Sequence, residues 1–388
     1  MIIGTAKLVV DLGNSETRVK TIYGKTAKGN PRSRLTVLDN RYSSISEEKI
    51  DLYMSGDSYS GENSSVFRVD NGLCYCNGDI CNIEMVQTSF RPSALEKKYE
   101  SLVTKLTLIN AIKQGIEDVA DFSNCDVDSI NVDWEIYLLL PPEDLENGAK
   151  PLADMVKSIT SVDFIMPKLQ KDVTIKTVKV FPEGMCAFFG VLFKRKGIIR
   201  PEYKYLIDNS ESTVIFDIGA GTTDIIMVKG SQVVQSSRFT KEVGGNNVHR
   251  LVQRSLRNKG ISLPDEVVRE GVNTGYVRSG SRTIDISEEI ASAKSAVSTQ
   301  LVDAVQEFFE SSMISIRTIA NILVCGGGAE NPENDEIEPI SNYIVNYMSR
   351  LSPDIKLIEL PREVSAEGEI VRMSPRLLNI AGAGILAE

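Results

Sequence analysis

The sequence predicts an α/β protein built from two domains of related design. Its 388 residues correspond to two to three structural units at roughly 150 residues each. Strands gather in two regions of the sequence, and each region opens with an apolar strand that ends in aspartate and turns back over glycine. A composition with 42% hydrophobic and 25% charged residues is typical of a soluble globular protein. The apolar runs are far shorter than the roughly 20 residues of a membrane span, and no signal peptide is recognised, so a cytoplasmic location is expected.

The first part of the chain contains a hairpin, a variable segment and a long helix. Residues 7–11 form an apolar strand, and residues 16–23 are its expected partner across a glycine turn. The polar, turn-rich segment 24–65 is expected to be exposed and to lead into a small hairpin at 66–81. A helix is expected at about 94–120, because apolar residues recur there at spacings of three and four.

Two buried strands, a helix and a linker follow. Residues 134–140 and 174–181 read as continuous apolar strands, and each ends at proline. A helix then runs from Glu183 to a group of cations followed by glycine, a pattern that suits a helix carboxyl end. The segment 201–212 is the best candidate for a linker.

The second part of the chain repeats the opening pattern. A strand pair at 213–217 and 223–228 again folds across a glycine turn. Amphipathic helices are expected at 246–259 and 287–311. The remaining expected elements are a strand at 322–325 that runs into three glycines, a strand near 355–359 and a carboxy-terminal helix at 379–386.

The charge balance and the cysteines limit the classes of partner. With 43 basic and 53 acidic residues, the net charge of -10 repels a phosphate backbone, so any role on nucleic acid is expected to run through a partner protein. Cys74, Cys76 and Cys81 lie close enough in sequence to suggest zinc, but His249 is the only histidine and is distant. Small buried thiols that pack are therefore favoured over a metal site, and His249 is expected to be structural.

The two Asp-glycine hairpins are the most specific feature. The first reads Asp11-Leu-Gly13-Asn14-Ser15, and the second reads Asp217-Ile-Gly219-Ala220-Gly221-Thr222-Thr223-Asp224. A glycine turn lets backbone amides approach a phosphate closely, and an aspartate at a strand end can hold the hydration shell of Mg²⁺. One such hairpin is most often an ordinary turn. Two of them, together with a third strand that ends in three glycines, favour a nucleotide site.

These motifs resemble the actin, sugar kinase and heat-shock chaperone ATPase superfamily, and within it the bacterial plasmid-partitioning actins of the ParM type. Gly326-Gly327-Gly328-Ala329-Glu330 matches the adenosine motif, and Pro182-Glu183 matches the opening of the first connecting helix. Gly244-Gly245-Asn246 matches the turn before a helix, and 379–384 matches the small-residue helix near the end. The motifs follow the family's order along the whole chain, although 24–90 matches poorly. The resemblance implies two actin-like, ribonuclease H-like domains that flank a nucleotide cleft.

The resemblance also implies domain limits. Residues 1–200 would form the first domain, with a variable subdomain at about 31–90 and completion by the helix at 375–388. Residues 201–374 would form the second domain, with a helical subdomain at about 255–314.

Roles around Mg²⁺ and ATP, or GTP, are implied as well. Asp11 and Asp217 would hold the metal through water, and Glu183 would orient the attacking water. The alternatives are turn caps for the aspartates and compensation of a helix-end charge for Glu183. Backbone amides and hydroxyls at the phosphates would come from Gly13, Asn14, Ser15, Gly219, Ala220, Gly221, Thr222 and Thr223. The ribose and adenine would be walled by Gly244, Gly245, Asn246, Gly326, Gly327 and Gly328.

Two cations have open alternatives. Arg18 stands seven residues after Asp11, where the family often has a cation at the nucleotide, but a solvated surface charge fits equally. Lys294 resembles the chaperone-type lysine near the purine, and a solvated lysine is the favoured alternative.

The implied function is a filament-forming ATPase that segregates plasmid or phage DNA. Its expected partners are further copies of itself and a basic DNA-binding adaptor, with DNA contacted only indirectly and no membrane. The alternatives are a small-molecule kinase of the same superfamily, an archaeal-type actin homologue or a cytoskeletal scaffold.

Overall fold

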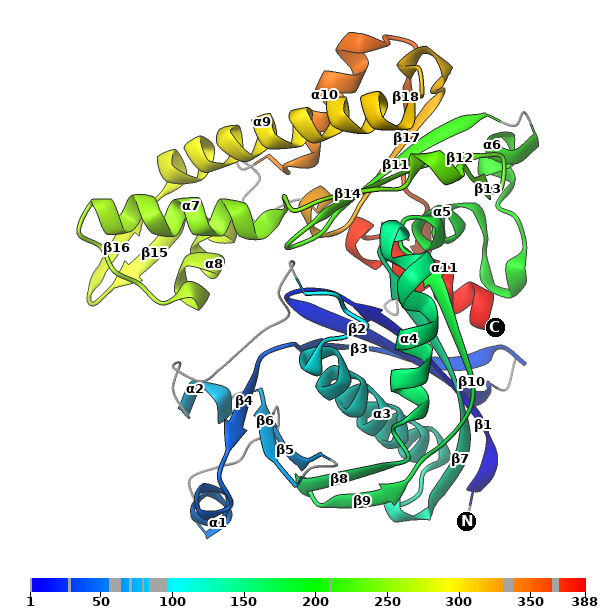
Figure 1. Ribbon diagram of the computed structural model, residues 1–388, viewed down its shortest axis with the longest axis vertical. Helices are drawn as coiled ribbons and strands as arrows, with labels where there is room; N and C mark the ends of the chain where they lie inside the picture. Colours follow the sequence, from blue (N-terminus) through cyan, green and yellow to red (C-terminus); the bar gives the residue numbers. More distant parts are fainter. Residues whose placement is uncertain are drawn as a thin grey trace. The chain divides into compact units, whose positions relative to one another are not determined.

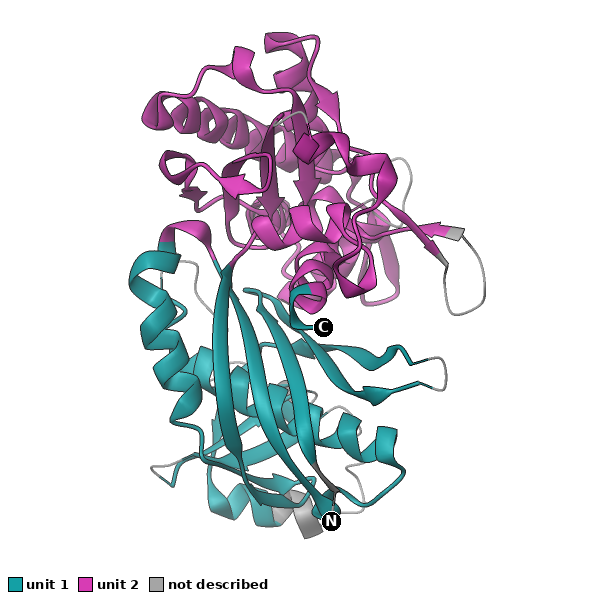
Figure 2. Cartoon of the chain, turned by 90° about the vertical axis from the view of Figure 1, so that its right-hand side faces the viewer, with its two compact units in different colours: residues 1–140, 144–181, 386–388 teal, residues 141–143, 182–385 magenta. Residues whose placement is uncertain are grey.

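The two Asp-glycine hairpins each lie within a mixed β-sheet, and the two sheets belong to separate units of the chain (Figures 1 and 2). Unit 1 comprises residues 1–140, 144–181 and 386–388, and unit 2 comprises residues 141–143 and 182–385. The computed structural model describes residues 2–26, 29–55, 64–69, 72–78, 80–83, 96–208, 211–330, 338–364 and 370–388.

The main sheet of unit 1 has the order β10-β7-β1-β2-β3, with β1 antiparallel to β2 and parallel to β7. Its strands are β1 (Ile2–Leu12), β2 (Glu16–Lys25), β3 (Pro31–Asp39), β7 (Ile130–Leu140) and β10 (Thr174–Pro182). Helix α3 (Leu102–Ser123) packs its apolar stripe on one face of this sheet (Figure 1). Gly115 allows this close approach, because a Cβ there would lie 2.9 Å from both Leu8 and Trp134.

A second, smaller sheet of unit 1 has the order β4-β6-β5-β8-β9. Its strands are β4 (Tyr42–Ile45), β5 (Ser65–Arg68), β6 (Cys74–Asn77), β8 (Ser161–Met166) and β9 (Leu169–Asp172). The hairpin expected at 66–81 is confirmed as β5 and β6. The exposure expected for 24–65 is wrong at Tyr42, which is fully buried, whereas β3 joins the main sheet with side chains that are exposed or half-buried. Residues 27–28 and 56–63 of this segment lie outside the described ranges. The other helices of unit 1 are α1 (Glu47–Ser55), α2 (Ile80–Ile83) and α4 (Leu145–Lys157).

The cysteines near residue 80 pack in an apolar core. Cys74, Cys76 and Cys81 are buried in one cluster with aliphatic side chains from the small sheet and α2. The Sγ atoms of Cys76 and Cys81 are 3.8 Å apart, and both residues are free thiols.

The sheet of unit 2 repeats the pattern of the main sheet of unit 1. Its order is β13-β12-β11-β17-β18, with β14 also on β12, and β11 is antiparallel to β12 and parallel to β17. Its strands are β11 (Ser212–Ile218), β12 (Thr223–Lys229), β13 (Gln232–Val233), β14 (Phe239–Lys241), β17 (Asn321–Cys325) and β18 (Lys356–Leu357). Two further hairpins are β15 (Tyr276–Ser279) with β16 (Arg282–Asp285), and β19 (Arg362–Val364) with β20 (Ile370–Arg372).

Two groups of helices belong to unit 2. One group shares the core of β11 and β17 and consists of α7 (Gly245–Asn258), α8 (Asp265–Thr274), α9 (Ser287–Ser312) and α10 (Ser341–Leu351). The second group consists of α5 (Met185–Leu192), α6 (Tyr205–Asp208) and α11 (Leu378–Ala387). Helices α5 and α11 approach closely, because a Cβ on Gly382 would overlap the carbonyl oxygen of Cys186. None of the helices in the described ranges is long and apolar enough to cross a lipid bilayer.

The chain divides into its two units between Phe181 and Pro182, and α11 groups with unit 2 as far as Ile385. The domain limits that the resemblance implied stay a prediction. The linker expected at 201–212 is wrong, because Tyr203 and Leu206 are buried in the core of unit 2 and Ser212 begins β11.

Candidate functional site

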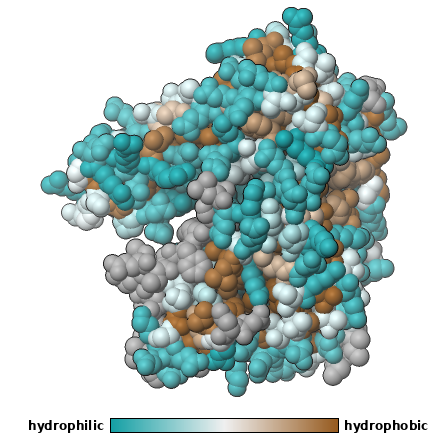
Figure 3. Space-filling model, viewed as in Figure 1, coloured by the Kyte–Doolittle hydropathy of each residue, from teal (hydrophilic) through white to brown (hydrophobic). Residues whose placement is uncertain are grey.

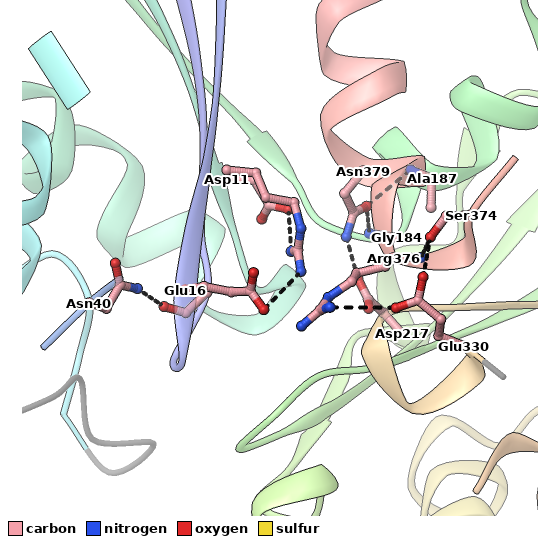
Figure 4. Close-up of polar contacts among 12 residues, drawn as sticks. Asp11, Glu16, Asn40, Gly184, Ala187, Asp217, Glu330, Ser374, Arg376 and Asn379 are labelled. Carbon is pink, nitrogen blue, oxygen red and sulfur yellow. Dashed lines mark hydrogen bonds and ion pairs between the residues drawn. The ribbon is translucent and has the colours of Figure 1, made fainter. Parts of the chain in front are cut away.

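The carboxylate of Asp11 lies at the end of β1 and is paired with a cation. Asp11 is 5% exposed, and Arg18 stands opposite it on β2. Arg18 Nη1 lies 3.4 Å from Asp11 Oδ2, and its second terminal nitrogen lies 4.0 Å from Glu16 (Figure 4). The reading of Arg18 as a solvated surface charge is therefore wrong, because its side chain is 12% exposed and partly neutralises Asp11.

The turn after β1 presents backbone amides. The amide of Gly13 donates to the carbonyl of Asp11 at 3.1 Å, and a Cβ on Gly13 would lie 2.4 Å from the carbonyl oxygen of Glu16. Asn40 holds the turn from outside, because its side-chain amide donates to the Gly13 carbonyl (Figure 4). Within the described residues, the amides of Asn14 and Ser15 donate no hydrogen bond and so are available to an anion.

Asp217 occupies the matching position in unit 2. It lies on β11, opposite Asp224 on β12 and beside Cys325 on β17, and it is 6% exposed. The side-chain amide of Asn379 on α11 donates to Asp217 Oδ2 (Figure 4). Asp224 has a different environment, because its Oδ1 accepts a hydrogen bond of 2.5 Å from the hydroxyl of Thr240.

The turn after β11 is joined to the start of α7. The amides of Gly245 and Asn246 donate to the carbonyls of Gly219 and Ala220 at 3.1 and 2.7 Å. This contact requires glycine at position 244, because a Cβ there would lie 2.5 Å from the Gly219 carbonyl oxygen. In the part of the chain that the structure describes, the amides of Ala220 and Gly221 have no hydrogen-bond acceptor. The second turn therefore offers the same kind of donors as the first.

The triple glycine after β17 packs directly on β11. Gly326 has a φ of +82°, and a Cβ there would lie 2.5 Å from Oδ1 of Asp217. A Cβ on Gly328 would lie 2.4 Å from the side chain of Ile218, whereas Gly327 meets its nearest atom at 3.9 Å. Two of the three glycines are thus required by packing within unit 2, and Gly327 has open space beside it. Glu330, at the end of the motif, is held by Ser374 at 2.8 Å and Arg376 at 3.5 Å (Figure 4).

Glu183 stands directly before α5 and is 8% exposed. Gly184, with a φ of +71°, lies between Glu183 and Met185, the first residue of the helix. Asn379 Oδ1 accepts from the amides of Gly184 and Ala187 at 3.0 and 3.1 Å. Asn379 was not among the expected site residues, although it is a polar residue within an otherwise apolar, small-residue helix, which is a usable signal.

Several expected site residues are engaged elsewhere. The hydroxyl of Thr223 donates to the carbonyl of Val243 at 2.7 Å and is buried, whereas Thr222 is half-buried at the turn. Asn246 Oδ1 accepts from Arg269 at 2.9 Å. Lys294 is 6% exposed and donates to the carbonyl of Glu338, so the solvated reading is wrong, and burial lowers the pKa of its ammonium to about 8.

His249 lies on α7 and behaves as a packed residue. Burial, and then the nearby Arg269 guanidinium, lower the pKa of its imidazole to about 4. The histidine is therefore neutral at physiological pH, in agreement with a structural role.

A family model for the carboxy-terminal part of archaeal MreB-like actin homologues matches residues 215–335. The matched range includes residues 215–218 of β11 and all of β12, α7, α9 and β17, so it contains the second Asp-glycine hairpin and the whole glycine motif. No curated protein matches the chain.

Solved structures resemble the chain over nearly its full length. A 15-stranded ParM filament from Clostridium botulinum has a TM-score of 0.66 and 18% identity, and 98% of each chain is covered. The actin-like protein Alp7A has a TM-score of 0.70 and 13% identity over 99% of this chain and 96% of the other. Ta0583, an archaeal actin homologue in complex with ADP, has a TM-score of 0.65 and 13% identity over 97% and 96% of the two chains.

Proposed function

We propose that this chain, which has the actin-like fold that its motifs predicted, is a nucleotide-dependent filament-forming ATPase that segregates plasmid or phage DNA. The observation that carries the proposal is the repeated hairpin. In each unit one strand, β1 or β11, has an antiparallel partner on one side and a parallel partner on the other. A buried aspartate lies near the end of this strand, and a glycine turn follows. Such a repeat supports a phosphate-binding role for each hairpin.

The donors and acceptors of both hairpins fit a magnesium nucleotide. The amides of Asn14, Ser15, Ala220 and Gly221 suit phosphate oxygens, because amide groups in such turns bind anions. Asp11 and Asp217 are acceptors of the type that Mg²⁺ holds through its water shell. Bound Mg²⁺ would supply neutralisation of phosphate charge. Arg18, which is paired with Asp11, would place a positive charge near the phosphates.

Glu183 is assigned to positioning and activating the attacking water. Its place before α5 is fixed by Asn379, which binds the first amides of the helix with one oxygen and Asp217 with its nitrogen. A carboxylate held in this way can accept a proton from water within hydrogen-bond reach. The competing assignment is compensation of the helix charge, which any glutamate at this position supplies.

Assembly and partners are assigned from the relatives. ParM forms filaments and Alp7A is an actin-like protein, and both have this fold over nearly their whole length. Copies that join head to tail make open filaments, since a heterologous contact does not close on itself. An acidic filament of chains with net charge -10 would engage DNA through a basic adaptor protein.

A second candidate function is a cytoskeletal actin homologue of the archaeal type. The match of residues 215–335 to the archaeal MreB-like model favours it. Both candidates share nucleotide binding and assembly, and they differ in the need for a DNA-binding adaptor. A small-molecule kinase would instead show no nucleotide-dependent assembly.

The test is to follow sedimentation, light scattering and phosphate release with Mg-ATP, with Mg-GTP and without nucleotide. Assembly that requires nucleotide, followed by phosphate release and disassembly, is expected. Transfer of phosphate to a small molecule without assembly would overturn the proposal. Pull-down of a basic DNA-binding protein by the filaments would favour DNA segregation over a cytoskeletal role.

A further inference from the structure

Helix α7 is basic in a chain that is acidic. Residues 245–258 contain no aspartate or glutamate, while the whole chain has 53 acidic and 43 basic residues. Three of its arginines are exposed at spacings of four and three residues, and they are named here the arginine row: Arg250, Arg254 and Arg257. The arm of unit 2 that carries α7 and α9 is largely hydrophilic on the face shown in Figure 3.

The arginine row points away from the core of unit 2. The buried face of α7 is made by Val248, Val252 and Leu256. Arg250 and Arg254 each come two positions after a buried valine, which places them about 200° around the helix from the core. Among the described residues, none of the three arginines forms an ion pair, and Arg250 only has long hydrogen bonds of 3.4 Å to Asn246 and Asn247.

Helix α9 carries a complementary set of charges. From Ser295 to the end of the helix at Ser312 there is no lysine or arginine. Three acidic residues are exposed in this stretch at spacings of four and three, and they are named here the acidic row: Asp303, Glu307 and Glu310. Each comes two positions after a buried residue of the same core, so the acidic row also faces outward. Glu307 is paired with Lys241 at 2.5 Å.

We propose that the arginine row of one copy binds the acidic row of a second copy. This inference rests on the proposed filament function and names one contact of the assembly. Both rows span about 10 Å along their helices at 1.5 Å per residue, so their charges match in number and spacing. Because α7 and α9 of one copy pack through their apolar faces, both rows face outward and can meet another molecule, although Glu307 also pairs with Lys241 of its own copy. When the two copies are not related by a two-fold axis, such a contact leaves one row of each copy for a further copy and therefore propagates.

A protein partner fits the arginine row better than nucleic acid. The net charge of -10 repels a phosphate backbone at long range, while the same chain supplies a matching acidic surface. Single exposed ion pairs stabilise little, but a row of complementary charges at an interface steers association and sets its register. The contact should therefore weaken when salt is raised from about 0.05 M to about 0.3 M.

The decisive experiment exchanges the charges. The arginine-row variant is R250E/R254E/R257E, and the acidic-row variant is D303K/E307K/E310K. Each variant alone places like charges against each other, so its critical concentration for nucleotide-dependent assembly should rise at least tenfold. In an equimolar mixture, every contact between unlike variants has opposite charges again. The mixture should therefore assemble close to the wild-type critical concentration.

A charge-matched control and nucleotide affinity exclude trivial causes. The control R195E/R317E/R350E makes the same charge change at three exposed arginines of unit 2 outside α7, and it should assemble like the wild type. All variants should bind Mg-ATP within about twofold of the wild type, which shows that they are folded. If single variants assemble normally, or if the mixture does not recover, the proposal is wrong. Equal loss in the control would assign the effect to net charge and also overturn it.

A second measurement does not depend on filaments. In R254K/R257K, a carbodiimide can couple the new lysines to carboxylates that contact them. Intermolecular peptides that join these lysines to the acidic row are expected, and their absence at high protein concentration would contradict the contact. If they form while no nucleotide assembles the wild-type protein, the contact stands and the proposed function fails. If instead a fluorescent duplex of about 30 base pairs binds the wild type and not R250E/R254E/R257E, the row serves nucleic acid and the proposal falls.

Discussion

Asn379 joins the carboxylate of Asp217 to the amino end of α5. Its nitrogen donates to Asp217 Oδ2, and its oxygen accepts from the amides of Gly184 and Ala187 at 3.0 and 3.1 Å (Figure 4). Asn379 is 8% exposed, so these contacts are made away from solvent. The side chain of Asn379 thus binds both Asp217, which is expected to hold the metal, and the amino end of α5, next to Glu183.

Replacing Asn379 by leucine should destabilise unit 2. The change removes the hydrogen-bond partner of the buried Asp217 carboxylate and of the amides of Gly184 and Ala187. The free energy of unfolding should therefore fall by about 2 to 4 kcal/mol. Urea unfolding followed by circular dichroism measures this loss. The matched control is Asn346→Leu, because Asn346 is exposed on α10. Equal midpoints for the two variants would show that the Asn379 contacts contribute little.

Asp217→Asn should weaken binding of Mg-ATP while it keeps an acceptor for Asn379. Removal of the negative charge should cost about 2 to 4 kcal/mol of metal and phosphate interaction if the carboxylate binds as proposed. Calorimetry with and without Mg²⁺ separates the two contributions, and the magnesium dependence should largely disappear. Asp208→Asn changes the net charge equally at an exposed site and serves as the control. Undiminished magnesium dependence in Asp217→Asn would remove this residue from the proposed site.

Glu183→Gln should separate assembly from hydrolysis. Glutamine keeps the shape of the side chain but is a much weaker base, so phosphate release should slow by roughly ten- to a thousandfold. Nucleotide affinity should hardly change, and filaments should persist longer. Scattering and phosphate release are followed together, with the exposed Glu202→Gln as control. Hydrolysis at the wild-type rate would show that Glu183 only compensates the charge at the amino end of α5.

Two adjacent glycines should respond differently to alanine. A Cβ on Gly244 would lie 2.5 and 2.8 Å from two backbone carbonyl oxygens, whereas a Cβ on Gly245 would lie 3.9 Å from its nearest atom. Gly244→Ala should therefore destabilise unit 2 by about 2 kcal/mol or more, because backbone must move. Gly245 is the first residue of α7, and alanine favours helix more than glycine does. Gly245→Ala should therefore leave the free energy of unfolding nearly unchanged or raise it slightly. Thermal unfolding of both variants measures the difference, and similar losses would contradict the close approach of α7 to the turn after β11.

His249 should make the protein less stable in mild acid. The pKa of the imidazole is about 4 in the folded chain against 6.5 ordinarily, so between these values the unfolded chain binds more protons. The free energy of unfolding that depends on the neutral imidazole is therefore at its full value above about pH 6.5, and it decreases as the pH drops toward 4. The loss should reach roughly 1 to 3 kcal/mol.

The comparison variant for this pH effect is His249→Gln, which cannot titrate in this range. Its urea midpoint should fall less between pH 7 and pH 5 than that of the wild type. Because the chain has one histidine, proton resonances of its ring report the folded pKa directly. A folded pKa near 6.5 would contradict the burial of this side chain.

Much of the fold followed from local patterns. Both hairpins, the strands at 134–140 and 174–181, and the helices at 246–259 and 287–311 are present as expected. The small sheet was missed because β8 and β9 lie far along the chain from β5, with which β8 pairs. Helices α4, α8 and α10 were also missed.

The sequence by itself determined the repeated strand, aspartate and glycine turn, because apolar alternation and glycine turns act over a few neighbouring residues. From these it determined the fold class and which residues to inspect. Only the tertiary structure decided that Asn379 binds Asp217, that Thr223 binds Val243 and that the arginine and acidic rows both face outward. It also decided that residues 201–208 join the core of unit 2 and are not a linker. These outcomes depend on which segments pack together over long separations, and such packing is governed by the shape and burial of the whole unit instead of by local sequence.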